Sequence, residues 1–509
     1  MSIQTIQQTT HNISEGFKSI RGAPSELYLT FFLKFLDSFS YFSFSLIFTL
    51  FLTEDFGYSD IQAGAIYGGW GALVTLFGLL TGVVVDGLGV SKSLKIGFAL
   101  QLVAKCVIFY TDSRITLMVA IGALSLGGCL GIPVLSIGIR RYTNTKNRGF
   151  AYGLFYCIMN VAALLSGPIV DFCTILYKNT GEEHDRQRLA QDGGYSDKYE
   201  WSLSGYRLIV LLGILTNILA CFTTLYVKEI KACDSDLDSS EENEGSNRVQ
   251  EFRPDETSKR EMIRETFRSK KFKRFLAVIM ITVNVRMIFR HLDATLPKYM
   301  VREFGENVAK GTIYAINPLL IIILVPIVTA GTSHIDPLVM IHHGSYISAA
   351  SVFVLAAFTS VPACVAFVII LSIGEAVWSP RLYDYANSMA KEGREGTYMA
   401  LSSAPLFLVK LPVGMMSGYL LQTFCPEEGP RNSKLMWLIV GLATASSPVL
   451  LTVCWKYISK KEVEDEEEIA LSVAAVPDEE MIPLAEIQNN HGLMKRPTTP
   501  RAELVSMKT

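Results

Sequence analysis

Ionisable side chains stand inside long apolar stretches of this sequence, where they could carry a proton or hold a charged ligand. Glu375 lies in SIGEAVWSP and Lys410 in FLVKLPVG. A charge at the centre of a bilayer costs at least roughly 2.5–3.5 kcal/mol on insertion scales, so such residues normally face a partner or a water-filled cavity. If these stretches cross a membrane, their charged residues are the first candidates for a functional site.

Glu375 is the strongest single candidate. Burial disfavours the charged form of a carboxyl group and nearby cations favour it, and this opposition suits a proton carrier. The alternative is a structural salt bridge from Glu375 to Arg286 or Lys410. Lys410 could also bind a carboxylate of a ligand. Trp378 is three residues beyond Glu375 on a similar helix face, where it could stack on a ligand or pack in the core.

Two further pairs of charges have helical spacing. Lys34 and Asp37 are three residues apart and share a helix face. They can neutralise each other, or form an ion pair that opens when a proton or ligand arrives, and Tyr41 extends the same face. Arg286 and Arg290 are four residues apart and repel each other, so we expect an anion opposite, either a protein carboxylate or a ligand. Arg290 could instead lie near the outer interface.

Four polar residues complete the candidates. Asn160 could form hydrogen bonds in a cavity, or bond one helix to another. We expect Asp293 to be an outer gate or a helix cap, His291 to lie at the membrane interface, and Lys105 to reach outward near the end of its helix.

The elements that position these residues are long apolar blocks. Of the 509 residues, 50% are hydrophobic and 18% are charged, and the blocks are about as long as the roughly 20 residues that a helix needs to cross a bilayer. We predict spanning helices at residues 27–52, 61–85, 93–110, 115–139, 150–176, 206–227, 275–292, 311–330, 337–357, 363–382, 398–421 and 435–455. The net charge of -2 says little, because charge sits almost wholly in the connections and tails, but the lack of a basic stripe argues against a nucleic-acid partner.

Charge in the connections predicts the orientation. Lysines and arginines gather in loops on one side, together with the two tails and a hydrophilic stretch at 228–274: Lys18, Arg21, Lys92, Lys95, Arg140, Arg141, Lys146, Arg148, Arg381, Lys391 and Arg394. Cytoplasmic loops carry such an excess, so we place this side in the cytoplasm.

The domain organisation follows from the same pattern. We predict a cytoplasmic tail at 1–26, a six-helix bundle at 27–227, a linker at 228–274, a second six-helix bundle at 275–456 and a tail at 457–509. The linker contains DSDLDSSEENEGS and the second tail begins with EVEDEEE, compositions that cannot bury apolar surface. We expect both to be disordered and available to cytosolic partners.

The two halves of the chain repeat. Gly127 is followed by Pro133 at the same spacing as Gly374 by Pro380, and this alignment puts Glu375 in the place of Gly128. Two parallel copies of about six helices are an arrangement found in secondary transporters. One half has acquired a carboxylate that the other lacks.

Two family resemblances support this interpretation. The loop GVVVDGLGVSKSLK resembles the signature of the major facilitator superfamily, through Gly82, Asp86, Gly89 and Lys92. The resemblance implies an all-α membrane protein of the major facilitator fold, with about twelve transmembrane helices in two six-helix bundles. Glycines allow the sharp turn, and Asp86 could pair with cations or a helix N-terminus in one conformation only, so this motif is a predicted cytoplasmic gate.

More narrowly, the sequence is similar to the proton-coupled oligopeptide transporter family. The similar segments are FSYFSFSLIFTLFLTEDFGYSD, FYCIMN, GEAVWSP and REGTYMAL. The family's first-helix motif has two glutamates and an arginine, where this sequence has Lys34, Asp37 and Ser38. Its fourth-helix lysine is Ile132 here. These departures suggest a divergent relative with a changed substrate.

These observations favour a secondary active or facilitative transporter that works by alternating access. The resemblance makes short peptides or amino acids the first choice of small polar solute, followed by sugars or organic anions, with coupling to protons at Glu375 and Asp37. The eroded first-helix motif leaves an alternative, a non-transporting sensor or partner protein. The host membrane would be the plasma membrane or an endolysosomal or vacuolar membrane.

Catalysis is not expected. The sequence has no nucleotide-binding GxxxxGK[ST] loop, and its histidines are scattered. The nine cysteines show no CxxC spacing and are expected to be buried free thiols. We therefore predict no enzyme activity, no cofactor and no metal site.

Overall fold

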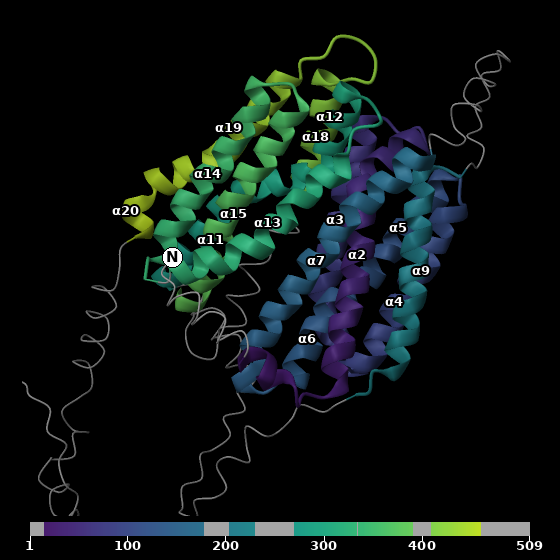
Figure 1. The fold of residues 1–509 in the computed structure, drawn as a ribbon, viewed down its shortest axis with the longest axis vertical. Helices are drawn as coiled ribbons and strands as arrows, with labels where there is room; N and C mark the ends of the chain where they lie inside the picture. Colours follow the sequence, from purple (N-terminus) through teal and green to yellow (C-terminus); the bar gives the residue numbers. More distant parts are fainter. Residues whose placement is uncertain (1–14, 178–202, 230–268, 333, 390–408, 460–509) are drawn as a thin grey trace, which may run out of the picture. The chain divides into compact units, whose positions relative to one another are not determined.

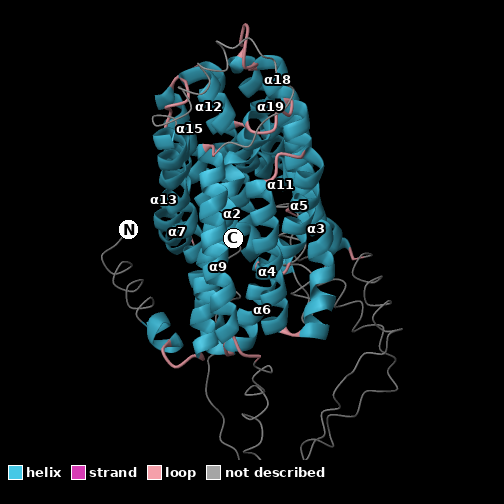
Figure 2. Cartoon of the chain, turned by 90° about the vertical axis from the view of Figure 1, so that its right-hand side faces the viewer, coloured by secondary structure: helices cyan, strands magenta, loops and turns pink. Residues whose placement is uncertain are grey.

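The computed structural model describes residues 15–177, 203–229, 269–332, 334–389 and 409–459. In these residues the regular structure is helical and no strand occurs (Figure 2). Ten helical segments of the described residues are long and apolar enough to cross a membrane, with Arg114–Tyr142 counted as one. The prediction of an all-α membrane protein is confirmed.

The first half of the chain forms one bundle, drawn in purple and blue in Figure 1. Its helices are α2 (Ser25–Glu54), α3 (Asp60–Leu88), α4 (Val90–Tyr110), α5 (Arg114–Cys129), α6 (Ile132–Tyr142), α7 (Thr145–Tyr177) and α9 (Gly205–Tyr226). The prediction of one unbroken helix at 115–139 is wrong, because the chain forms two helices there, α5 and α6, with a break between them. Gly131 has φ -89° and ψ -96°, outside the helical region, and α6 restarts with a proline in its first turn, where the missing N–H is not needed.

The second half forms another bundle, drawn in green. Its helices are α11 (Lys270–Ala294), α12 (Leu296–Phe304), α13 (Lys310–Gly331), α14 (Pro337–Ala357), α15 (Val361–Met389), α18 (Lys410–Phe424), α19 (Ser433–Val453) and α20 (Trp455–Ile458). Helix α11 begins before residue 275, and a break at Thr295 separates it from α12, which again has a proline in its first turn. The predicted helix at 398–421 lies outside the described residues up to 408.

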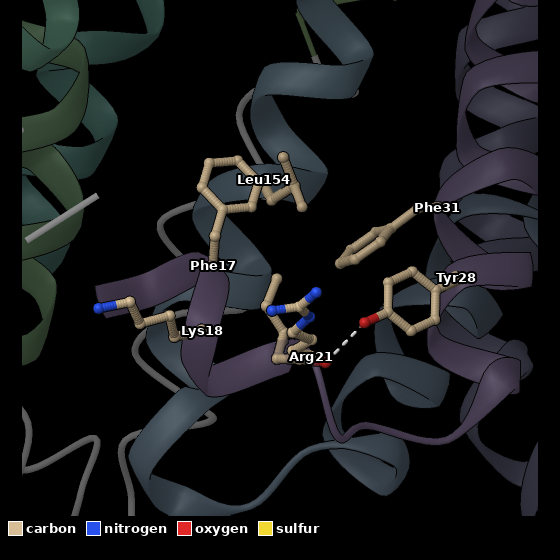
Figure 3. Close-up of a pocket in the computed structure, with 7 residues that line it drawn as sticks. Phe17, Lys18, Arg21, Tyr28, Phe31 and Leu154 are labelled. Atoms are coloured by element: carbon tan, nitrogen blue, oxygen red, sulfur yellow. Dashed lines mark hydrogen bonds between the residues drawn. The ribbon is translucent and has the colours of Figure 1, made fainter. Parts of the chain in front are cut away.

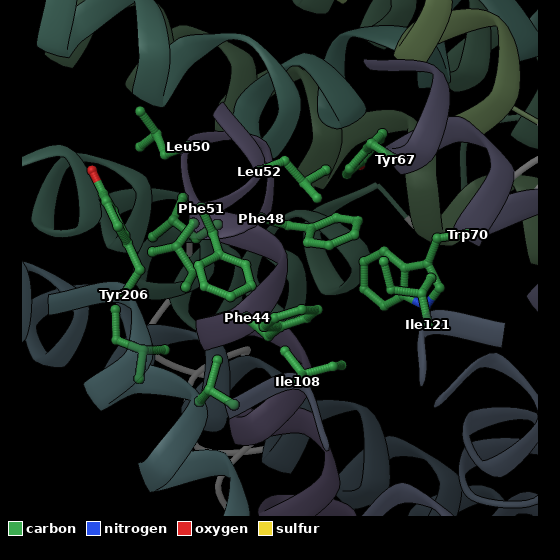
Figure 4. Close-up of a cluster of buried hydrophobic side chains, with 14 of the residues drawn as sticks. Phe44, Phe48, Leu50, Phe51, Leu52, Tyr67, Trp70, Ile108, Ile121 and Tyr206 are labelled. Carbon is green, nitrogen blue, oxygen red and sulfur yellow. The ribbon is translucent and has the colours of Figure 1, made fainter. Parts of the chain in front are cut away.

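Each bundle has an apolar core, and the core of the first bundle also takes in Ala294, Val409 and Val413 of the second. In the first bundle Phe44, Phe48 and Phe51 of α2 pack against Trp70 of α3, with the rings of Phe48 and Trp70 5.2 Å apart (Figure 4). In the second, Trp437 packs against Tyr299 and Phe367. Large apolar side chains such as Phe172, Leu442 and Val103 remain exposed, as expected of helices that face lipid.

Glycines set the contact between the bundles. A Cβ on Gly64 of α3 would lie 2.2 Å from the carbonyl oxygen of Gly414 in α18, and a Cβ on Gly167 of α7 would lie 2.1 Å from that of Gly311 in α13. Small residues allow such close backbone approach in membranes. We call the end where α9 stops at Tyr226 and α11 starts the linker end, and the opposite end, with the α2–α3 connection, the far end.

Candidate functional site

Glu375 lies on α15 and is half-buried. Its Oε2 accepts a hydrogen bond of 2.8 Å from the Nδ2 of Asn317 on α13, and Asn317 also donates to Ser372 at 3.1 Å. The carboxylate acts electrostatically on Tyr156, which belongs to α7 of the other bundle. No ion pair joins Glu375 to Arg286 or Lys410 among the described residues, so neither of the salt bridges considered above is formed.

Arg286 is buried in the second bundle, with 4% of its surface exposed. Its guanidinium lies 5.2 Å from the ring centroid of Trp378. Within the described part of the chain, its Nε and Nη2 atoms have no hydrogen-bond partner. Trp378 is itself buried and donates from Nε1 to the Oγ of Ser348 at 3.1 Å. Trp378 therefore packs in the core, where it supports the arginine.

Lys410 turns toward the first bundle. Its ammonium lies 4.0 Å from the ring of Trp70, 4.9 Å from that of Tyr41 and 5.1 Å from that of Tyr67. Aromatic faces attract a cation in this way. A Cβ on Gly71 would lie 2.3 Å from the Lys410 side chain, so this glycine leaves room for the lysine.

Arg290 and Asp293 lie where α11 meets α2. Their charged groups are 3.6 Å apart, and Asp293 accepts a hydrogen bond of 2.6 Å from Ser45 of α2. Asp293 therefore contributes to a contact between the bundles, as a gate residue would. His291 is fully buried, and its Nδ1 lies 2.6 Å from the hydroxyl of Thr295. The expectation of an interfacial His291 is wrong, because the imidazole packs inside the second bundle near the α11–α12 break.

Lys34, Asp37 and Lys105 form a buried polar network inside the first bundle. The ammonium of Lys34 lies 4.6 Å from the ring of Phe155, and Asp37 accepts from Gln101 at 3.2 Å. Lys105 donates to Ser40 and, at 3.0 Å, to Asn217. The expectation that Lys105 reaches outward is therefore wrong, because its face of α4 packs against α2 and α9.

Asn160 lies apart from this network. Its Nδ2 donates to the carbonyl of Tyr156, one turn earlier in α7, at 3.0 Å.

A charge cluster at the far end was missed by the sequence analysis. Asp60, the first residue of α3 and outside its apolar span, accepts from Lys298 at 2.6 Å and from Arg302 at 2.8 and 2.9 Å. Both cations belong to α12. Burial opposes the charge on Asp60, but the two cations outweigh it and hold the pKa of this carboxyl below its usual range. The ionised Asp60 therefore stabilises the folded protein at pH values above the usual pKa of an aspartate. This stabilisation is lost only as the pH falls through the lowered pKa.

A second contact at the far end joins α7 to α13. The carboxylate of Asp171 accepts from the backbone N–H groups of Gly311 and Thr312, each at 2.7 Å, and from the hydroxyl of Thr312 at 2.7 Å. Free N–H groups and the helix dipole make a helix N-terminus a favourable place for a carboxylate. Asp60 stands at a helix end, where polar residues are ordinary and give no sequence signal. Asp171 lies within the predicted span 150–176, and its apolar neighbours were a signal that the sequence analysis did not use.

The predicted cytoplasmic gate motif lies at the linker end. The backbone of Gly82 and Asp86 belongs to α3, but their side chains are outside the described part of the structure. Gly89 ends α3 with φ +80°, a left-handed value that favours glycine, and Lys92 is exposed.

Glu229, assigned above to the linker, holds this end of the first bundle. It accepts from the N–H groups of Val90 and Ser91 at 3.1 and 2.8 Å and pairs with Arg141 at 2.7 Å.

A cavity of about 590 Å³ opens beside α2 and α7 at the linker end (Figure 3). Its lining combines two cations with aromatic and aliphatic side chains: Phe17, Lys18, Ile20, Arg21, Tyr28, Phe31 and Leu154. The hydroxyl of Tyr28 donates to the carbonyl of Ile20 at 2.7 Å. None of the predicted site residues lines this cavity.

Two bundles of long apolar helices that enclose charged side chains define a multi-pass membrane transporter. The model of the Major Facilitator Superfamily matches residues 30–409, and the chain belongs to this superfamily. No curated protein matches the sequence.

Solved structures show the same fold at low sequence identity. A POT family transporter in complex with 5-aminolevulinic acid has a TM-score of 0.65 and 15% identity over 86% of this chain and 98% of that chain. A bacterial homolog of the human lysosomal transporter Spinster has a TM-score of 0.64 and 14% identity, over 85% of this chain and 95% of that chain. The nucleoside transporter NupG has a TM-score of 0.63 and 10% identity, over 84% of this chain and 99% of that chain. The predicted superfamily is confirmed, and POT family transporters share its fold.

Proposed function

We propose that the protein carries a small polar organic solute across a membrane by alternating access, with short peptides or amino acids as the first candidates. The observation that carries this proposal is the placement of Glu375. The fold holds a carboxylate on α15, oriented by Asn317, where it acts on Tyr156 of the opposite bundle. Such a carboxylate can receive a proton or the amine of a solute.

The polar contacts between the bundles support alternating access. Among the described residues they all lie in the half of the molecule toward the far end, where α2 meets α11, α3 meets α12 and α18, and α7 meets α13. A transporter closed at one end by such contacts can open there only by breaking them. This arrangement fits one of the two states that alternating access requires.

Purified protein in liposomes tests the function. We expect uptake or counterflow of peptides or amino acids, with accumulation driven by a pH gradient if protons are coupled. A protein that only senses or binds partners would move none of them. Sugars and organic anions belong in the same panel, because Arg286 and Lys410 form no ion pair with a described carboxylate, an arrangement that favours an anionic solute.

Glu375→Gln separates the roles of the carboxylate, because it keeps the shape and cannot ionise. Loss of pH-driven accumulation with intact counterflow indicates a proton carrier. Loss of binding and counterflow together indicates a site for a cationic group. Unchanged behaviour in both assays removes Glu375 from the site. The matched control is Asp384→Asn on the same helix, whose carboxylate is 46% exposed and pairs with Arg381 at the linker end.

The proposal also includes proton coupling through Asp37, cytosolic partners of the linker and tail, and a plasma, endolysosomal or vacuolar membrane as host. Cytosolic partners require the orientation predicted from the loop cations, for which the Discussion gives a test.

A further inference from the structure

The Arg286 guanidinium is left without a partner in the middle of the protein. Native structures pair nearly all buried polar groups, and an unpaired buried charge calls for an explanation. Nε and Nη2 are sealed from solvent and donate to no acceptor among the described residues. The carboxylate that shares its surroundings, Glu375, is bonded to Asn317 instead.

The arginine is nevertheless held in a defined orientation. The Cζ of its guanidinium lies 5.2 Å from the centroid of the Trp378 ring, and Trp378 is held by its hydrogen bond to Ser348 and by the ring of Phe289 at 5.9 Å. A Cβ on Gly344 would lie 2.8 Å from the Cβ of Trp378, so the close packing of α14 and α15 locks this ring in place. The contact with the ring leaves the Nε and Nη2 donors without a hydrogen-bond partner among the described residues. These two donors form an edge of the guanidinium that matches the two oxygens of a carboxylate.

The surroundings also favour an anion. Arg286 and Glu375 both act electrostatically on Tyr156 of the first bundle, whose side chain is 39% exposed, so both lie near the space between the bundles. Arg290 has Asp293 as its partner. Arg286 and Arg290 both act on Glu375, and Arg290 and Asp293 act on Lys410. The cations Arg286, Arg290 and Lys410 thus stand against the carboxylates of Glu375 and Asp293, an excess of positive charge that a solute with a carboxylate would neutralise.

We propose that Arg286 is the binding subsite for a carboxylate group of the transported solute, and that Trp378 and Ser348 are its positioning residues. The inference deepens the proposed function and rests on it. A solute that also has an amine would place that amine toward Glu375.

Matched pairs of probes test the subsite. Alanylalanine, alanine and lactate each differ from alanylalanine amide, alaninamide and lactamide only at the carboxylate. Binding is measured on the purified full-length chain by thermal shift, since a ligand of the folded state raises its melting temperature. We expect the wild type to bind at least one acid about 10- to 100-fold more tightly than its amide, the range of a hydrogen bond to a charged group.

Substitutions then test whether Arg286 causes the preference for the acid over its amide. Arg286→Gln should abolish it, and Arg286→Lys, which keeps the charge without the planar fork, should retain part of it. Arg140→Gln, at an exposed position of the linker end, should leave it unchanged. Because the guanidinium has no hydrogen-bond or ion-pair partner to lose among the described residues, and only its contact with Trp378, Arg286→Gln should lower the melting temperature of the ligand-free protein little.

The outcomes separate this inference from the proposed function. If Arg286→Gln binds an acid and its amide with the wild-type preference, or if the wild type binds each acid and its amide equally tightly, the carboxylate subsite is overturned while transport stands. A large drop in melting temperature with an unchanged preference assigns Arg286 a structural role and also overturns it. If the wild type neither binds nor carries any of the three acids, both proposals fail together.

Discussion

At the residue scale, the buried charges of the first bundle are unbalanced. Lys34 and Lys105 both act on Asp37, and all three side chains are at most 6% exposed. Two ammonium groups thus share one carboxylate in a place where charge is costly. Asp37 holds the network together through its bond to Gln101 and its attraction to both lysines.

The first prediction concerns Asp37→Asn. Removing this carboxylate leaves two buried cations without a counter-charge, a change that typically costs about 3–5 kcal/mol for a buried pair. We expect a clear drop in the melting temperature of the purified protein. The double variant Asp37→Asn/Lys105→Met should recover part of the loss, because it removes one of the two cations. If the double variant is less stable than the single one, the charge-balance argument is wrong.

The second prediction concerns the cluster at Asp60. Asp60→Asn removes the carboxylate to which the buried Lys298 and Arg302 are hydrogen-bonded, and so should favour states in which the far end opens. The measurement is the distance between spin labels at the exposed positions Tyr110 and Glu428, one in each bundle. We expect a population at longer distance.

Asp112→Asn is the matched control for this experiment. Asp112 pairs with Arg207 at 3.1 Å within the first bundle, so its loss should leave the distance between the bundles unchanged. Equal distance distributions for Asp60→Asn and the wild type would exclude a gating role for Asp60.

At the element scale, the closeness of α3 and α18 depends on missing side chains. The Cβ of an alanine at Gly64 would lie 2.2 Å from a backbone oxygen of α18, whereas one at Gly69 would meet nothing within 4 Å. Backbone cannot move aside as a flexible side chain can. Gly69 should therefore tolerate an added side chain and Gly64 should not, although both lie on the same helix.

The third prediction uses this difference. Gly64→Ala should push α3 away from α18, lengthen the distance between labels at Tyr110 and Glu428, and lower the melting temperature. Gly69→Ala should do neither, and a gain in stability of up to about 1 kcal/mol would be consistent with the better helix propensity of alanine. Identical behaviour of the two variants would show that the interface tolerates repacking.

Helix bounds were well predicted because apolar length alone decides where a chain can cross a bilayer. The break at Gly131 was not, since a run of apolar residues looks the same with or without an interruption, and Pro133 shortly after it was the available signal. Helix α12 was not predicted either, because the predicted span ended at residue 292 and the short stretch that follows is too polar to cross a bilayer.

At the scale of the whole molecule, the sequence identified which charges are buried but not which of them meet. Glu375, Arg286 and Lys410 were recognised because a charge in an apolar block is conspicuous. Their partners depend on how helices rotate and pack, which only the fold determines. Residues at helix ends, such as Asp60 and Glu229, were missed because polar residues are ordinary there.

The orientation of the molecule is the last prediction. Lysines and arginines in the short loops place the linker end in the cytoplasm. Lys92 is exposed at that end and Glu428 at the far end. In cells that express a single-cysteine variant at one of these positions, a membrane-impermeant thiol reagent should distinguish the two sides.

If the protein is in the plasma membrane, the reagent should label Glu428→Cys on intact cells and reach Lys92→Cys only after the plasma membrane is permeabilised. If it is in an internal membrane, intact cells should show no labelling of either variant. Selective permeabilisation of the plasma membrane should then expose Lys92→Cys alone, because the far end would face the lumen. Labelling of Lys92→Cys on intact cells would show that the orientation is the opposite of the predicted one. Glu375 and Arg286 would then be reached from the outside in the state described here.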